Sequence, residues 1–285
     1  PYSNMFNTFT MSEYNGEYPP YTFPIGVGDG QLGMLFNDLS VKKQKMIKNP
    51  YSLVYIQPQP EWGIHSKYCF LSFLEMTCKK YHKHRIFEMI IPEWIEGDLQ
   101  HDSPFYYKAM KIVKKYYSNV SIKYPDVDGD EDIVMFVENQ KNNDMFMFRA
   151  DILPQPRETF ISLMKGSVQD ILVTGDQSIT DVISCCRNEK NIWYQIAPWK
   201  QDFAYYLSKE LPNKTYETFK TSCGTIKSLS LPNIKWDTFF EKYDFRIFGK
   251  LRTNQIMRFI DEKKKHKILF DTLLYNIDHS RYLET

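Results

Sequence analysis

Short apolar segments alternate with longer amphipathic segments between Tyr51 and Leu211, and this alternation limits the possible folds more than any other feature of the chain. The apolar segments have the length of buried strands, and the segments between them place apolar residues at helical spacing, as Phe70, Leu74 and Tyr81 illustrate. Connections of this length cross over between parallel strands. We therefore predict an α/β chain with a Rossmann-like, doubly wound parallel sheet. The expected strands are 53–56, 86–91, 118–123, 132–137, 145–149, 170–174 and 191–196, with the fourth and fifth as a possible hairpin.

Three regions follow from this pattern. Residues 1–50 are interpreted as an N-terminal arm that contains a glycine-rich loop and a short amphipathic segment at 34–47. Residues 51–225 form the expected nucleotide-binding domain. Residues 226–285 are expected to form C-terminal helices, because the chain reads as helical after Cys223.

Composition excludes several classes of protein. The 36 basic and 35 acidic residues give a net charge of +1, which argues against a chain whose main task is to bind nucleic acid. No apolar run approaches the length of a membrane span, and no secretory signal is visible at the start. Five cysteines without a Cys-x-x-Cys pair suit a reducing compartment, so a protein of the cytoplasm or of another reducing compartment is expected.

The turn from Thr174 to Ser178 is the best candidate for a ligand site. It follows an apolar strand and opens a helix, and ligands of open parallel sheets bind beyond the carboxyl ends of the strands. Gly175 permits a sharp turn or a close approach, and the amides at the start of the helix suit a pyrophosphate. The alternative is that Ser178 simply caps the helix and Gly175 serves the turn.

Residues 148–213 resemble the C-terminal half of GT-B glycosyltransferases, above all the bacterial peptidoglycan N-acetylglucosaminyltransferases and their relatives. The resemblance rests on an ordered pattern: a loop with a proline, a short helix, a strand ending in a small-residue turn, a helix bearing an acidic residue, another strand, and a loop ending in Gln. In this chain the parts are Arg149–Pro156, Glu158–Lys165, Ile171–Ser178, Asp181, Trp193–Pro198 and Gln201.

The resemblance implies a role for each matching residue. Asp181 would accept hydrogen bonds from the donor ribose, Gly175 to Ser178 would hold the diphosphate, and Gln201 would contact the transferred sugar. The loop Ala150–Leu153, with Ile152, would contact the base through its backbone. Tyr194 would stack on the base or reach a phosphate, or else pack in the core as a strand residue. The donor-binding set is thus Ile152, Gly175, Gln177, Ser178, Asp181, Tyr194 and Gln201.

The chain departs from the family in two respects. The family has a glycine-rich turn where this chain has Asp176 and Gln177. A GT-B enzyme also has two such domains, and residues 1–50 are too few for the first. A carboxylate is unusual next to a diphosphate, so Asp176 is expected to face the acceptor or a sugar hydroxyl instead. Asp176 is therefore also a candidate for the catalytic base.

A second glycine-rich stretch, Gly28-x-Gly30-x-x-Gly33, matches the spacing of a dinucleotide fingerprint. Three interpretations stay open: a plain loop, a loop lining a cleft between domains, and dinucleotide binding. In the second, Asp29 is a candidate general base, since inverting transfer needs a group that removes the acceptor proton.

The acidic run Asp126, Asp128, Asp130 and Asp132 contains the Asp-x-Asp signature of metal-dependent glycosyltransferases, but an acidic surface turn explains it as well. His82 and His84 have no cysteine or carboxylate at ligand spacing, so no metal site is expected there.

These observations predict a glycosyltransferase that moves a sugar from a nucleoside diphosphate to a glycan, lipid or protein acceptor, with no metal and no bound cofactor. A metal-dependent Asp-x-Asp enzyme and a non-catalytic nucleotide-binding module are the alternatives. No nucleic-acid partner and no transmembrane segment are expected.

Overall fold

The computed structural model describes residues 4–7, 24–27, 33–34, 36–58, 63–99, 103–124, 133–137, 144–196, 201–211 and 215–244. The chain divides into two compact units. One contains residues 40–195 and 214–232, and the other contains residues 1–39, 196–213 and 233–285. The units do not follow the boundaries expected at residues 50 and 225, because the sheet unit gains a C-terminal hairpin and an extended segment before its first strand.

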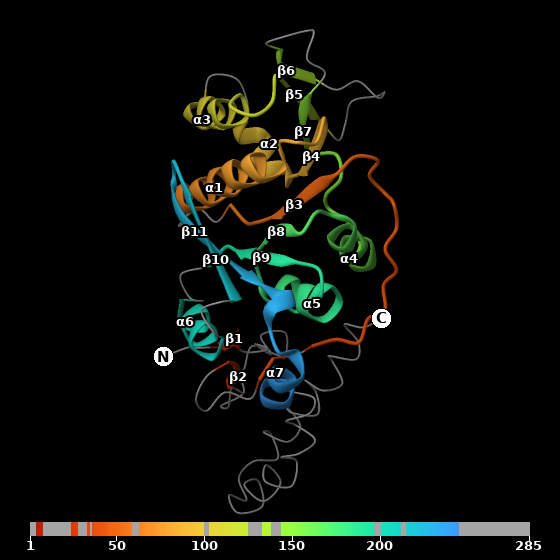
Figure 1. Ribbon diagram of the computed structural model, residues 1–285, viewed down its shortest axis with the longest axis vertical. Helices are drawn as coiled ribbons and strands as arrows, with labels where there is room; N and C mark the ends of the chain where they lie inside the picture. Colours follow the sequence, from red (N-terminus) through yellow and green to blue (C-terminus); the bar gives the residue numbers. More distant parts are fainter. Residues whose placement is uncertain are drawn as a thin grey trace, which may run out of the picture. The chain divides into compact units, whose positions relative to one another are not determined.

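A nine-stranded, mostly parallel sheet forms the centre of the larger unit (Figure 1). Six neighbouring strands are parallel, and antiparallel strands close both edges. The strand order is β10-β11-β9-β8-β3-β4-β7-β5-β6. The strands are β3 (Tyr51–Tyr55), β4 (Ile86–Ile90), β5 (Asn119–Lys123), β6 (Ile133–Val137), β7 (Met145–Arg149), β8 (Asp170–Val173), β9 (Asn191–Tyr194), β10 (Tyr216–Thr221) and β11 (Gly224–Ser230).

Helices cover both faces of this sheet (Figure 1), as the strand-helix alternation predicts. One face packs against α1 (Gly63–Tyr81), α2 (Glu93–Asp98) and α3 (Pro104–Val113). The other packs against α4 (Arg157–Gly166) and α5 (Asp176–Cys186). The arrangement is α/β and Rossmann-like.

Local sequence explains where these helices begin. Ser103 accepts a hydrogen bond from the amide of Tyr106 at 2.9 Å, and Pro104 occupies the first turn of α3, where its missing N–H costs nothing. Phe70 and Leu74 are fully buried one turn apart on α1. Burying each such side chain contributes about 1.5–3 kcal/mol to folding.

Alternate residues of the parallel strands face the two helical layers. Val54 of β3 and Phe148 of β7 lie in the core beneath α1–α3, and the rings of Phe70 and Phe148 are 6.4 Å apart. On the opposite face, Tyr55 meets Phe160 of α4 edge-on at 5.0 Å. The sheet is therefore buried on both sides along β3, as a doubly wound sheet requires.

Two expectations about local structure are wrong. Strands 132–137 and 145–149 do not form a hairpin, because β5 lies between them and pairs parallel with β7 and antiparallel with β6. The stretch after Cys223 is not helical at first, since β10 and β11 form a hairpin that ends beside β9. Residues 36–47, in the amphipathic segment, have no regular secondary structure, and polar contacts to α4 hold their backbone.

The smaller unit contains β1 (Asn4–Asn7) paired antiparallel with β2 (Pro24–Gly26), together with α6 (Gln201–Glu210) and α7 (Trp236–Tyr243). Phe36 packs edge-on against Phe240 at 4.9 Å, and Lys242 pairs with Glu210 at 2.7 Å. A short 3-10 turn, Leu231–Asn233, precedes α7. No helix in the described part of the chain is long and apolar enough to cross a bilayer.

Candidate functional site

The strand order reverses between β3 and β8. The chain leaves β3 through α1 on one face of the sheet and leaves β8 through α5 on the other face. Such a reversal separates the connections at the carboxyl ends of the two strands and creates the position where ligands of open α/β sheets bind. The predicted turn from Thr174 to Ser178 follows β8 at this reversal.

Gly175 begins α5 in a conformation that only glycine adopts readily, with φ +83° and ψ 161°. Among the described residues, no heavy atom outside Gly175 and its two chain neighbours lies within 4 Å of the position that a β-carbon would occupy there. Helix α5 starts at Asp176, and no side chain caps its first turn. The prediction that Ser178 is the N-cap is therefore wrong, because two residues of the helix precede it.

Asp181 lies on α5 with its carboxylate buried and paired. Its side chain is 3% exposed, and Arg157 donates to its two oxygens at 2.8 and 3.2 Å. The Gln177 side chain donates to Oδ1 of Asp181 at 2.9 Å. Asp181 thus connects the first turns of α4 and α5, while Arg157 keeps 27% of its side chain exposed and Gln177 is exposed.

Arg157 was not singled out from the sequence. It follows Pro154-Gln155-Pro156 and reads as an ordinary first-turn residue. Its partner lies 24 positions away, so the pairing needs the α4–β8–α5 crossover to exist. The only signal in the sequence was a basic residue at the start of a helix, where a cation is electrostatically disfavoured.

At the reversal of strand order, Gln195 joins the end of β9 to the end of β3 and to α1. Its side chain accepts from the amide of Gln57 at 3.0 Å and donates to the Gln57 carbonyl at 3.1 Å and to Ser66 of α1 at 2.8 Å. The Gln195 carbonyl accepts a hydrogen bond from Thr174 at 3.1 Å. The carboxyl ends of β3, β8 and β9 are therefore tied together.

The structure places the other residues predicted for the donor site in different elements and at different degrees of burial. Tyr194 ends β9 in register with Val173 and is half-buried, and Ile152 lies half-buried in the loop between β7 and α4. Ser178 is buried, at 7% exposure. Gln201 is the first residue of α6, in the smaller unit.

Several predicted residues lie outside what the structure describes. These are Asp29, with Gly28 and Gly30 of the same loop, the side chains of Asp176 and Gln201, and the acidic run 126–132. Within the described ranges, no group of three or more His, Cys, Asp or Glu residues is arranged to hold a metal ion. Gly33 is described, and it has a φ of 100°.

A charged cluster marks the end of β7, next to the loop that holds Ile152. Arg149 donates to Asp151 twice at 2.7 Å and to Glu88 at 2.5 Å. These carboxylates raise the pKa of the Arg149 guanidinium above its ordinary value, against the opposing effect of burial. The cluster fixes the direction in which the loop leaves the sheet.

No protein-family model, no curated protein and no solved structure matches the chain.

Proposed function

We propose that the chain binds a nucleoside diphosphate sugar at the first turn of α5 and transfers the sugar to an acceptor, as GT-B glycosyltransferases do. One observation carries the proposal. An α-helix without a side-chain cap begins at the reversal of strand order, directly after a glycine with open space above its α-carbon. The first-turn amides and the helix dipole together favour a diphosphate at such a position.

The pair formed by Arg157 and Asp181 supports this assignment. The pair is neutral overall, but the buried carboxylate holds the partly exposed guanidinium beside Gln177 in the first turn of α5, where its N–H groups act as charge-assisted donors. In the transfer reaction, negative charge grows on the departing diphosphate, so fixed donors and cations at this position stabilise the transition state more than the ground state. A divalent metal is not needed for that step in this proposal.

We assign the contact to the donor ribose to Gln177 in place of Asp181. The Asp181 carboxylate is buried and engaged by Arg157 and Gln177, so we assign it the role of positioning these two side chains. Gln177 is exposed, and an amide both donates and accepts, which suits a vicinal diol. Asp29 and Asp176 stay predictions for the catalytic base, and Tyr194 for a contact to the base or a phosphate.

A thermal-shift screen of the full chain against UDP-, GDP-, dTDP- and CMP-sugars tests the proposal. A bound donor raises the unfolding temperature by mass action. Gln177→Ala should weaken that donor by about three- to tenfold, because an exposed hydroxyl contact contributes about 0.5–1.5 kcal/mol. Glu158→Gln, an exposed change in the first turn of α4, is the matched control and should leave the affinity unchanged.

The outcomes separate the alternatives. Binding with slow hydrolysis of the donor supports the transferase, and binding without any turnover supports a nucleotide-binding module. Stimulation of binding by manganese, with loss on chelation, supports the metal-dependent alternative. If none of the four donors shifts the unfolding temperature, the proposal is wrong.

A further inference from the structure

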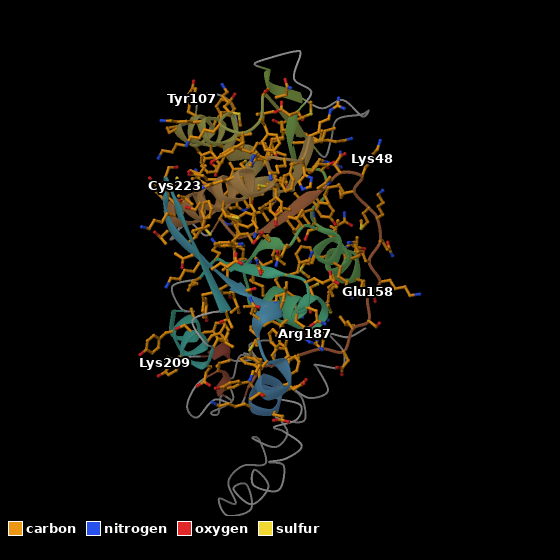
Figure 2. The ribbon with its side chains drawn as sticks, in the orientation of Figure 1. Lys48, Tyr107, Glu158, Arg187, Lys209 and Cys223 are labelled. Atoms are coloured by element: carbon orange, nitrogen blue, oxygen red, sulfur yellow. The ribbon has the colours of Figure 1, made fainter. Side chains whose placement is uncertain are left out.

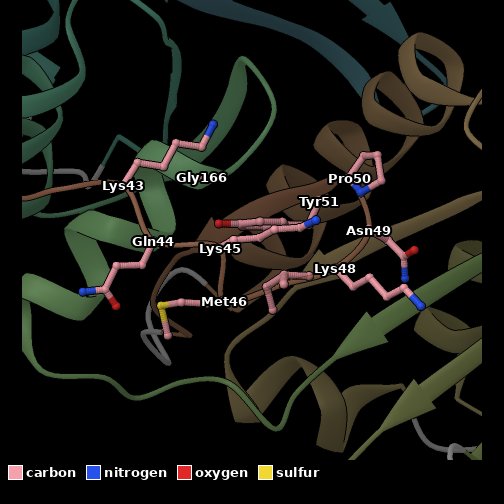
Figure 3. Close-up of a pocket in the computed structure, with 10 residues that line it drawn as sticks. Lys43, Gln44, Lys45, Met46, Lys48, Asn49, Pro50, Tyr51 and Gly166 are labelled. Atoms are coloured by element: carbon pink, nitrogen blue, oxygen red, sulfur yellow. The ribbon is translucent and has the colours of Figure 1, made fainter.

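Two adjoining hollows lie at the amino ends of β3 and β4, on the edge of the sheet opposite the candidate donor site (Figure 3). The first has a volume of about 390 Å³ and is lined by residues 43–51 and Gly166. The second has a volume of about 440 Å³ and is lined by Asn49, Pro50, His84, Arg85 and Ile86. Because they share Asn49 and Pro50, we treat them as one groove and call it the amino-edge groove.

The backbone that carries the lysines of this groove is fixed to α4. Ser162 accepts from the amide of Gln44 at 3.0 Å and donates to the carbonyl of Lys42 at 3.2 Å. Lys165 donates to the carbonyl of Val41 at 2.5 Å, and Ile47 is buried. The lysines therefore project from a segment that is already ordered, which lowers the entropy lost on binding.

The floor of the groove is equally well defined. Tyr51 donates its hydroxyl to the carbonyl of Leu163 at 2.8 Å, and a β-carbon on Gly166 would lie 2.2 Å from that hydroxyl oxygen. Asn49 donates to Glu88 at 2.7 Å. A glycine at position 166 is thus required for the hollow to have its observed floor.

Positive charge dominates the groove. Lys43, Lys45 and Lys48 are exposed, and no ion pair among the described residues includes them. Figure 3 shows Lys43 and Lys48 apart from each other along the lining segment, with their side chains pointing in different directions. No carboxylate is among the described residues that line either hollow.

A buried lysine, Lys190, adds to the positive charge of the groove. Lys190 donates to the carbonyls of Ser167 and Val168 at 2.6 and 3.1 Å, next to Gly166. Burial lowers the pKa of Lys190 to about 8, and the charge of Lys43 contributes to the decrease. Lys190 and the exposed lysines therefore concentrate positive charge at this edge, although the carboxylates of Glu88, Asp170 and Glu189 oppose part of it.

We infer that the amino-edge groove binds a compact ligand that carries two or more phosphate groups. Lysine ammonium groups bind phosphate as point charges, and the volume of the first hollow is that of a small-molecule site. A nucleic-acid strand fits less well, because single strands need free ring faces for base stacking. Tyr51 in the floor is buried, and the exposed ring of His84 already stacks against Tyr81 and Phe87.

Isothermal titration of the full chain with tripolyphosphate and with inositol hexakisphosphate, at about 150 mM salt, tests this inference. The groove variant is Lys43→Gln/Lys45→Gln/Lys48→Gln. The matched control is Lys111→Gln/Lys220→Gln/Lys227→Gln, which removes the same charge from exposed positions elsewhere in the sheet unit. We expect one equivalent of the probe to bind, at least about tenfold more weakly to the groove variant than to the control. The first turn of α5 is unchanged in both triple variants, so the binding that the groove variant loses and the control keeps belongs to the groove and not to the donor site.

Two further arms identify the source of the phosphates. Vesicles with a multiply phosphorylated headgroup and the same headgroup without acyl chains distinguish a lipid from a free metabolite. Binding of a single-stranded oligonucleotide that tightens with length and exceeds binding of both phosphate probes overturns the inference. An absence of probe binding, or an equal loss in the two triple variants, overturns it as well.

Discussion

The guanidinium of Arg157 donates to both carboxylate oxygens of Asp181, with an Nη2–Oδ1 distance of 2.8 Å and an Nε–Oδ2 distance of 3.2 Å. The pair joins the first turn of α4 to the second turn of α5, and the two helices leave the same edge of the sheet. Figure 2 labels Glu158, the residue after Arg157, on the outside of α4. The pair therefore positions the candidate site, and its neighbour provides a comparison without a buried partner.

Asp181→Asn should lower the free energy of unfolding by about 1–3 kcal/mol. Breaking a buried ion pair costs more than this range, but Arg157 is partly exposed, so solvent reduces the loss. Urea denaturation measures the change. Glu158→Gln should stay within about 0.5 kcal/mol of the native chain, and equal losses in the two variants would contradict the role of the pair.

Gly175→Ala should destabilise the chain by about 1–3 kcal/mol through backbone strain alone, because open space surrounds the new methyl group. Gly97→Ala is the matched change in α2, where the space is also open and no positive φ occurs. That variant should be neutral or stabilising by up to about 1 kcal/mol. Denaturation midpoints that fall equally in the two variants would contradict the strained conformation at Gly175.

Gly166→Ala should cost about 1–3 kcal/mol, because its methyl group collides with the hydroxyl of Tyr51. Tyr51→Phe alone should cost about 1 kcal/mol by removing the hydrogen bond to Leu163. The double variant should lose less than the sum, since removal of the hydroxyl makes room for the methyl group. A double-mutant cycle measures this coupling, and strict additivity would contradict the contact.

Lys190 should make stability rise with pH in the alkaline range. Burial lowers its pKa from 10.5 to about 8 in the folded chain, so between these values the unfolded chain binds more protons. Between pH 8 and 10, the native chain should therefore gain up to about 1.4 kcal/mol per pH unit relative to Lys190→Met. Comparison with the variant cancels the opposite effect of tyrosines and cysteines that titrate in the same range. Parallel stability curves for the two chains would contradict the shift.

The sequence predicts the elements of the sheet better than their order. Strands such as 86–90 and 170–173 are apolar on both faces except at Glu88 and Asp170, and this pattern identifies them individually. It does not identify neighbours, because β7 can pair with β4 as well as it can with β6. Sequence proximity favoured the hairpin, but the open position between β4 and β5 allows β7 to be buried on both edges.

The candidate site was predictable only in part. A glycine between an apolar strand and a helix indicated the turn at Gly175, and the structure places it at the reversal of strand order. Arg157 and Gln195 were missed because their partners, Asp181 and Gln57, lie 24 and 138 positions away. Such contacts depend on the crossovers, which no local pattern contains.

The side chain of Gln195 determines which part of the candidate site is able to move when a ligand binds. Three hydrogen bonds join it to Gln57 and Ser66, so the strand ends on either side of β8 cannot spread apart unless all three break. Any widening that admits a bulky ligand must then occur in the segment between β7 and α4. Exchanging that segment would accordingly alter the selectivity among ligands of different size. The strand ends would keep their positions.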